Sequence, residues 1–157
     1  MKLFLLDTNI LVGYIRAAGY AGYVEKKFNL FNTENVSVIS VVTIAEIKSL
    51  AFKFGWGKNK IAIMNDLVKR IPSVKIDSEQ ILDAFAEIDS FSQGKHPSLK
   101  LPSGMSSRNM QDNDIWIAST ASVLNATLIS TDKDFEHLSN NFIKYFYVDQ
   151  SLNENDA

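Results

Sequence analysis

The stretch that decides the fold is residues 1–12, which read MKLFLLDTNILV. Its uninterrupted apolar run, residues 3–6, is typical of a β-strand that is buried on both faces. Asp7 ends this run, and Thr8-Asn9 lead into a second apolar segment. A carboxylate at the end of a buried parallel strand lies at the carboxyl edge of the sheet, where α/β proteins place their functional sites. We therefore expect further functional carboxylates at the same edge.

The length and composition indicate one ordinary globular domain. The chain has 157 residues, of which 46% are hydrophobic and 22% are charged, so it can bury a substantial core. It has no cysteine, which excludes disulfides and thiolate metal sites and fits a reducing compartment. The first apolar run is too short for a signal peptide, and no stretch approaches the roughly 18 apolar residues of a membrane span. We expect a cytoplasmic protein.

The net charge of −2 argues against a general nucleic-acid binder. Any contact with nucleic acid would have to use a local basic patch or a metal ion.

Strand-like and helix-like segments alternate along the whole chain. Apolar or β-branched runs predict further strands at 36–42, 74–77, 127–130 and 143–148. Helical spacing predicts helices at 10–18, 23–31, 43–54, 58–71, 78–91, 111–124 and 132–139. No tight hairpin joins two strands, so we predict a three-layer α/β/α fold with a central, mostly parallel sheet of about four to five strands. We assign residues 1–148 to a single domain and expect the polar tail, 149–157, to fray.

Four acidic residues stand where a predicted strand ends or a predicted helix begins. They are Asp7, Glu46, Asp114 and Asp132. In a parallel sheet these positions share one edge, so their carboxylates can converge. Converging carboxylates repel one another and acquire raised pKa values unless a cation neutralises them. Mg²⁺ and Mn²⁺ suit such oxygen ligands, and either can activate water and stabilise the charge on a phosphodiester during cleavage.

Each of these acids also has a purely structural interpretation. Asp7 can cap the following helix through an Asx-turn. Thr43-Ile-Ala-Glu46 matches the capping-box pattern, in which the glutamate serves only the backbone. The other acids fit capping or first-turn positions that the helix dipole favours: Asp112, Asp114, Asp132 and Asp134. Capping explains any one acid, but it explains four acids at corresponding edges of one sheet much less easily.

Four short motifs carry these acids, and they span most of the chain. They are Leu6-Asp7-Thr8-Asn9, Ala45-Glu46, Asn113-Asp114-Ile-Trp-Ile-Ala118 and Thr131-Asp132-Lys-Asp134-Phe135. Together they resemble the PIN-domain family, in particular the VapC-type toxins of toxin–antitoxin systems. The resemblance implies a metal-dependent endoribonuclease, with Mg²⁺ or Mn²⁺ as its cofactor and RNA as its substrate. It also implies two protein partners, a small DNA-binding antitoxin that blocks the site and a second copy in a homodimer.

The resemblance further implies roles for individual residues. The catalytic acids would be Asp7, Glu46, Asp114 and Asp132. Asp7, Asp114 and Asp132 would hold the metal, and a water that the metal activates would attack the phosphodiester in line. Polar support would come from Thr8 and Thr131. Two neighbouring acids stay open: Asp134 can share or replace the role of Asp132, and Asp112 is a bystander or a ligand through water.

The stretch 92–109 is the only long one without periodicity, and the resemblance does not account for its length. It carries Lys95, His96, Lys100 and Arg108 and no acidic residue. These cations can steer an RNA backbone, which would make affinity fall with salt. A solvated flexible loop is the alternative. We expect His96 and His137 to lie at the surface and to bind no metal.

Packing contacts are candidates for several aromatic residues. We expect Trp56 and Trp116 to pack in a core or an interface rather than stack on bases. The apolar stretches 14–31 and 51–56 form a candidate partner surface, although core packing explains the same residues.

Two other functions fit part of the pattern. In haloacid-dehalogenase-like phosphatases an aspartate after the first strand accepts a phosphoryl group. Those enzymes need Asp-x-Asp, whereas this chain has Asp7-Thr8-Asn9. The second alternative is a catalytically inactive PIN-like module that binds RNA or protein. The presence of all four acids argues against it.

Overall fold

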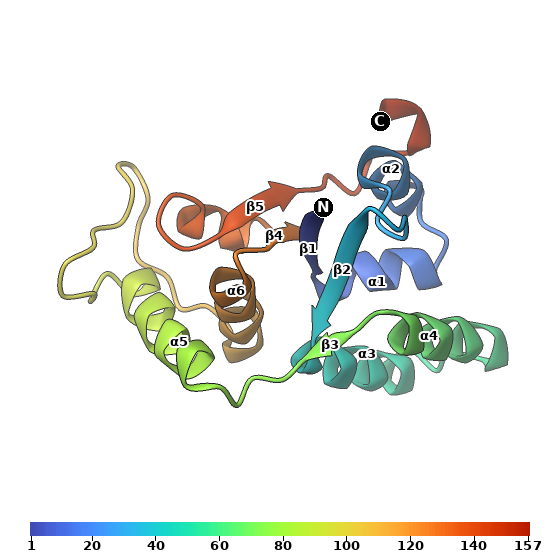
Figure 1. The fold of residues 1–157 in the computed structure, drawn as a ribbon, viewed down its shortest axis with the longest axis horizontal. Helices are drawn as coiled ribbons and strands as arrows, with labels where there is room; N and C mark the ends of the chain where they lie inside the picture. The colour runs from blue at the N-terminus through green and yellow to red at the C-terminus, as the bar shows by residue number, and fades with distance from the viewer.

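A computed structural model describes all residues, 1–157, and contains one five-stranded parallel β-sheet between two layers of helices (Figure 1). The strands are β1 (Lys2–Leu6), β2 (Asn35–Ser40), β3 (Ser73–Val74), β4 (Thr127–Ser130) and β5 (Lys144–Tyr147). Their order across the sheet is β3-β2-β1-β4-β5, and every neighbouring pair is parallel. The predicted three-layer α/β/α fold is confirmed.

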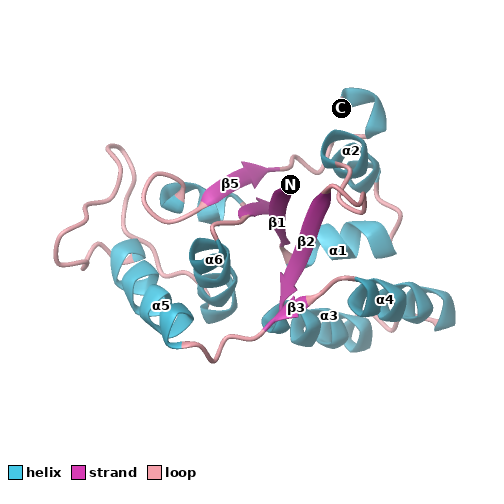
Figure 2. Ribbon diagram, viewed as in Figure 1, coloured by secondary structure: helices cyan, strands magenta, loops and turns pink.

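The helices form two groups, one on each face of the sheet (Figure 2). One group contains α1 (Thr8–Ile15), α2 (Gly19–Phe28), α3 (Val41–Lys53) and α4 (Lys58–Arg70). The other contains α5 (Glu79–Ser92) and α6 (Asp112–Leu124). No helix is long and apolar enough to cross a membrane.

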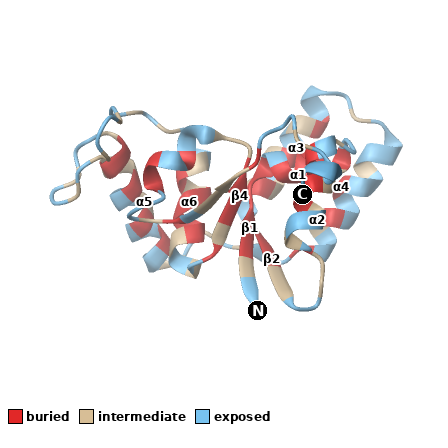
Figure 3. Cartoon of the chain, turned by 90° about the horizontal axis from the view of Figure 1, so that it is seen from above, coloured by how far each residue is buried: buried red, intermediate tan, exposed pale blue.

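Strand β1 lies at the centre of the sheet and contributes to both cores. Phe4 and Leu6 pack with the α1–α4 group, whereas Leu5 packs with α5 and α6. Successive side chains of a strand point to opposite faces, so an uninterrupted apolar run is what this position requires. Figure 3 shows buried residues concentrated along β1 and β4 and on the inward faces of the helices. Truncating Leu5 or Leu6 to alanine should cost about 2–5 kcal/mol of stability.

Helix α3 begins two residues earlier than the sequence predicts. Its N-cap is Ser40, whose Oγ accepts a hydrogen bond from the backbone N of Val42 at 3.2 Å. Because this cap starts the helix, strand β2 ends at Ser40. The next two residues are valines, which favour a strand, but they form the first turn of α3 instead. Glu46 consequently lies in the second turn, so the capping-box interpretation of Thr43 and Glu46 is wrong.

The C-terminal tail, which the sequence predicts to fray, contacts α2 in the structure. It ends in a short 3₁₀ turn, η2 (Glu154–Asp156), in which the backbone N of Asn153 donates to Oδ2 of Asp156 at 2.9 Å. The turn packs on α2, where Gly22 leaves room for it. A Cβ at Gly22 would lie only 3.3 Å from Cβ of Glu154. Lys26 Nζ of α2 also donates to the carbonyl oxygen of Glu154 at 3.1 Å.

The irregular segment between α5 and α6 is anchored rather than loose. Nδ1 of His96 accepts hydrogen bonds from the backbone N atoms of Ser98 and Leu99, at 3.2 and 3.0 Å. At its far end, the backbone N of Arg108 donates to the carbonyl oxygen of Ser92 at 2.8 Å. These contacts hold a loop that extends outward from the end of α5 before the chain returns to α6 (Figure 1).

The expected surface position of both histidines is wrong. His137 is 1% exposed, its Nε2 lies 2.8 Å from Oγ of Ser92, and its ring stacks on Phe91. The side chain of His96 is 8% exposed because it turns inward to hold its loop. Burial, followed by the charge of Arg108, lowers the pKa of His137 to about 4.

Candidate functional site

Two hydrogen bonds hold the carboxylate of Asp7 at the end of β1. Oδ1 accepts from the backbone N of Thr8 at 2.8 Å, which makes Asp7 the N-cap of α1. Oδ2 accepts from Oγ of Ser130, the last residue of the neighbouring strand β4, at 2.5 Å. The residue is only 4% exposed. Burial, reinforced by the charges of Glu46 and Asp132, raises the pKa of Asp7 to about 6 despite these hydrogen bonds.

Helix α3 brings Glu46 beside the start of α1. Oγ1 of the buried Thr8 donates to Oε1 of Glu46 at 2.7 Å and lies 3.3 Å from Oγ1 of Thr43. Because a threonine hydroxyl has one hydrogen, Thr43 serves as the donor to Thr8 while Thr8 donates to Glu46. The carboxylate of Glu46 is therefore held by a side chain of α1, and it lines the same cleft as Asp7.

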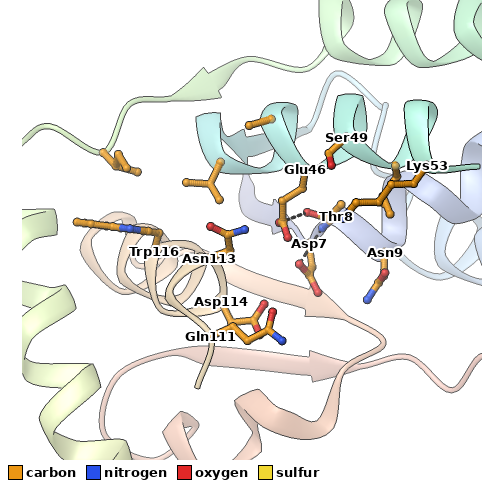
Figure 4. A pocket seen from close by; sticks show the side chains of 14 residues that line it. Asp7, Thr8, Asn9, Glu46, Ser49, Lys53, Gln111, Asn113, Asp114 and Trp116 are labelled. Atoms are coloured by element: carbon orange, nitrogen blue, oxygen red, sulfur yellow. Dashed lines mark hydrogen bonds between the residues drawn. The ribbon is translucent and has the colours of Figure 1, made fainter. Parts of the chain in front are cut away.

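A cleft of about 630 Å³ opens between α3 and α6 (Figure 4). Three carboxylates line it: Asp7, Glu46 and Asp114. Its remaining polar lining consists of Thr8, Asn9, Ser49, Lys53, Gln111 and Asn113. Asp114 enters from the first turn of α6. Its pKa is raised to about 7, first by burial and then by the charges of Asp7 and Asp132.

Asp132 lies beside Asp7 but does not line the cleft. Its backbone N donates at 2.9 Å to Oγ of Ser130, the hydroxyl that itself donates to Asp7. Oδ1 of Asp132 accepts from the backbone N of Asp134 at 2.8 Å and caps the short 3₁₀ helix η1 (Lys133–Leu138). The charge of Asp132 raises the pKa of both Asp7 and Asp114, whereas Asp134 acts on Asp114 alone and least of its neighbours. Asp132 also shares the Ser130 hydroxyl with Asp7, whereas Asp134 does not.

The remaining candidate residues lie outside this group. Oγ1 of Thr131 accepts from Nε2 of Gln150 at 3.2 Å, and Asp112 is exposed. Asp134 is also exposed, and its Oδ1 lies 3.9 Å from Nη1 of Arg108. Lys95 and Arg108 line one shallow hollow of the loop, whereas Lys100 is exposed elsewhere on it.

Ser130 is a site residue that the sequence alone does not reveal. It ends a predicted strand, but nothing in the sequence says that this strand lies next to β1. In the structure Leu6 pairs with Ile129, which sets the Ser130 hydroxyl against Asp7.

The carboxylates of the cleft are also the candidate ligands of a metal ion. No group of three or more aspartate, glutamate, histidine or cysteine side chains is close enough to hold one ion by direct contacts. The donor chemistry nevertheless fits a hard divalent cation, since Mg²⁺ usually binds one or two carboxylates and keeps several waters. Burial, followed by the charges of the neighbouring acids, raises the pKa of Asp7 and of Asp114, and no cationic side chain is among the groups that offset this negative charge. A divalent cation would compensate it.

A sequence model of the PIN domain matches residues 4–141, a range that contains all four acids. The chain belongs to the PIN domain family. PIN domains are nucleases, and they generally use divalent metal ions. A search of curated proteins found no significant match.

Several solved structures share the fold of this PIN domain, among them a member of the VapBC family of toxin–antitoxin systems from Mycobacterium tuberculosis. VapBC2 from Rickettsia felis, bound to a DNA fragment from its promoter, contains a chain with 21% identity and a TM-score of 0.72, covering 94% of this chain and 99% of that chain. VapBC-1 from nontypeable Haemophilus influenzae has a chain with 24% identity and a TM-score of 0.65, and the match covers 92% of this chain and 97% of that chain. FitAcB from Neisseria gonorrhoeae has a chain with 20% identity and a TM-score of 0.64, and the match covers 91% of this chain and 96% of that chain. At these identities the likeness shows a shared fold.

Proposed function

We propose that this PIN domain is a metal-dependent endoribonuclease and the toxin of a toxin–antitoxin pair. The convergence of Asp7, Glu46 and Asp114 on one cleft, with Asp132 beside them, is the observation that carries the enzymatic part. A binding module has no need to concentrate buried negative charge, which costs stability and repels the phosphates of RNA.

The proposed mechanism assigns a task to each acid. Asp7, Asp114 and Asp132 would hold Mg²⁺ or Mn²⁺, partly through water. When bound, such an ion supplies positive charge that stabilises the phosphodiester under attack and lowers the pKa of water. Glu46, fixed by Thr8, lies on the α3 side of the cleft, where it can accept a proton from the attacking water. No protein nucleophile is needed.

The toxin assignment rests on the fold shared with VapBC and FitAcB complexes. Under this proposal the protein is cytoplasmic, forms a homodimer and binds a small antitoxin that covers the cleft. Of the candidate partner surface, much of 14–31 is core: Tyr20, Tyr23 and Val24 are buried. At the end of α3, Phe52 is 90% exposed, and Phe54 is 58% exposed with the guanidinium of Arg16 over its ring at 4.7 Å from the centroid.

The test is cleavage of a mixed cellular RNA pool by purified protein, with Mg²⁺ or Mn²⁺ and with chelator. Asp7→Asn and Asp114→Asn serve as site variants, and Asp83→Asn, an exposed acid of α5, is the matched control. Circular dichroism establishes that each variant is folded. We expect metal-dependent cleavage by wild type and Asp83→Asn, and its loss in both site variants.

Other outcomes contradict the proposal in different ways. Equal cleavage by all four proteins would identify a contaminating nuclease. No cleavage by any protein, together with no Mg²⁺ binding in calorimetry, would favour the catalytically inactive module. Single-stranded DNA of matched sequence, run in parallel, tests whether RNA is the preferred substrate.

A further inference from the structure

Trp116 forms an apolar wall at one end of the acidic cleft. It lies three residues after Asn113 on α6, so both side chains occupy one helix face, and both line the cleft. Figure 4 shows the indole at one end of the cleft and Lys53 at the opposite end, with the side chains of Asp7 and Glu46 between them.

Of the two positions expected for Trp116, a core or an interface, the structure contradicts the core. The ring belongs to neither hydrophobic core and is not among the partly buried residues that pack against them. Ile76, another apolar residue of the cleft lining, is likewise outside both cores. Trp56, in contrast, packs against the core on the α1–α4 side. Core packing therefore does not explain why a tryptophan occupies this position in the cleft lining.

Phe85 of α5 fixes the indole in place. The two ring centroids are 4.1 Å apart at an interplanar angle of 35°. Phe85 itself packs against the core on the α5–α6 side. One face of Trp116 is thus backed by a side chain anchored in the core, while the residue borders the cleft. A ring held in this way is pre-organised to stack on a flat ligand.

We propose that Trp116, together with Ile76, binds a nucleobase of the RNA beside the cleaved phosphodiester. This inference rests on the proposed nuclease function and adds a substrate contact to it. Lys53 is the only cationic residue in the cleft lining, so ion pairs alone offset little of the repulsion between phosphates and the acids. Stacking on an aromatic ring supplies affinity that needs no positive charge. Both faces of a base in a duplex are covered by its neighbours, so the base on Trp116 must be unpaired.

Tryptophan fluorescence tests the contact without relying on cleavage. The chain has two tryptophans, and Trp56→Phe leaves Trp116 as the only one. This variant is titrated, in Mg²⁺, with a ten-nucleotide 2′-O-methyl oligoadenylate, because purines stack strongly. An abasic oligomer of the same length has the same backbone charge and no bases, and a duplex form hides them.

We expect the single-stranded oligoadenylate to quench Trp116 and the abasic and duplex forms to leave it unchanged. Equal quenching by the abasic oligomer would assign the signal to the backbone and overturn the base contact. No quenching by any oligomer would overturn it as well, and would leave the ring free for a protein segment.

Kinetics on single-stranded RNA separate this inference from the nuclease proposal. In the Trp56→Phe background, Trp116→Leu should raise KM by about tenfold, within the range measured for lost base stacking, while Trp116→Phe should stay close to the background protein. Leu82→Ala, an exposed apolar residue of α5 outside the cleft, is the matched control. Cleavage with unchanged KM in Trp116→Leu would reject the base contact and leave the nuclease intact. Base-dependent quenching without cleavage would reject the nuclease and leave the contact intact.

Discussion

Replacing Asp7 with asparagine should stabilise the protein in the absence of divalent cations. The substitution removes a buried charge and keeps the size of the side chain. Raising the pKa of Asp7 from 3.8 to about 6 corresponds to about 3 kcal/mol of unfavourable free energy for the charged form at neutral pH. The amide can still accept from the backbone N of Thr8, but it no longer accepts from Ser130. The raised pKa already includes the stabilising effect of that hydrogen bond, so the expected net gain is about 3 kcal/mol.

The pH dependence has a defined sign. Because the pKa of Asp7 is higher in the folded protein than in the unfolded chain, the folded state binds more protons between those two values. Stability therefore falls as pH rises from about 4 to about 6, and the full penalty applies above that range. Asp114, with its pKa raised to about 7, acts in the same direction and extends the fall to about pH 7.

Urea unfolding in the presence of chelator measures both effects, at about pH 5 and about pH 8. We expect wild type to be more stable at the lower pH, and Asp7→Asn to be the more stable protein at the higher pH with a weaker pH dependence. Asp83→Asn, an exposed acid, should follow wild type at both. A lower stability of Asp7→Asn at about pH 8 would refute the reasoning, because it would mean that hydrogen bonding outweighs burial.

Three further predictions concern the site and the loop. Mg²⁺ should raise the melting temperature of wild type more at about pH 8 than at about pH 5, because the ligands must be deprotonated, and thermal scans of Asp114→Asn should lose most of this effect. Glu46→Gln should slow RNA cleavage by at least about 100-fold. The free energy of unfolding should change little, since Thr8 can donate to the amide oxygen. Full activity of this variant would leave Glu46 with a structural role only. Replacing Lys95, Lys100 and Arg108 by glutamine should weaken the salt dependence of RNA binding by about 0.7 in log–log slope for each lost phosphate contact, and an unchanged slope would place the loop off the RNA path.

The fold could be predicted because its strongest signals are local. The run from Leu3 to Leu6 has no polar residue, which only a strand with a core on each side requires, and β1 is the central strand. The start of α3 was misplaced because two valines after Ser40 favour a strand while the serine hydroxyl favours a helix cap, and the cap prevails. The contacts of the tail with α2 could not be predicted, because composition does not encode them.

The site could be predicted only in part. Asp7, Glu46 and Asp114 were located because the ends of parallel strands and the helices that follow them share one edge of the sheet. The contact from Ser130 to Asp7 depends on β4 lying next to β1, and the strand order does not follow from spacing along the chain. The burial of His137 could not be predicted for a similar reason, since its partner Ser92 comes from a different part of the chain.

Asp7 shows why capping and chemistry are not exclusive explanations of an acid. It caps α1, and a carboxylate at a helix N-terminus that accepts hydrogen bonds normally has a lowered pKa. Its pKa is raised instead, first by burial and further by the charges of Glu46 and Asp132. Asparagine or serine would cap α1 without this penalty. Capping alone therefore does not explain an aspartate at this position, whereas a divalent cation that binds in the cleft would turn the penalty into binding energy.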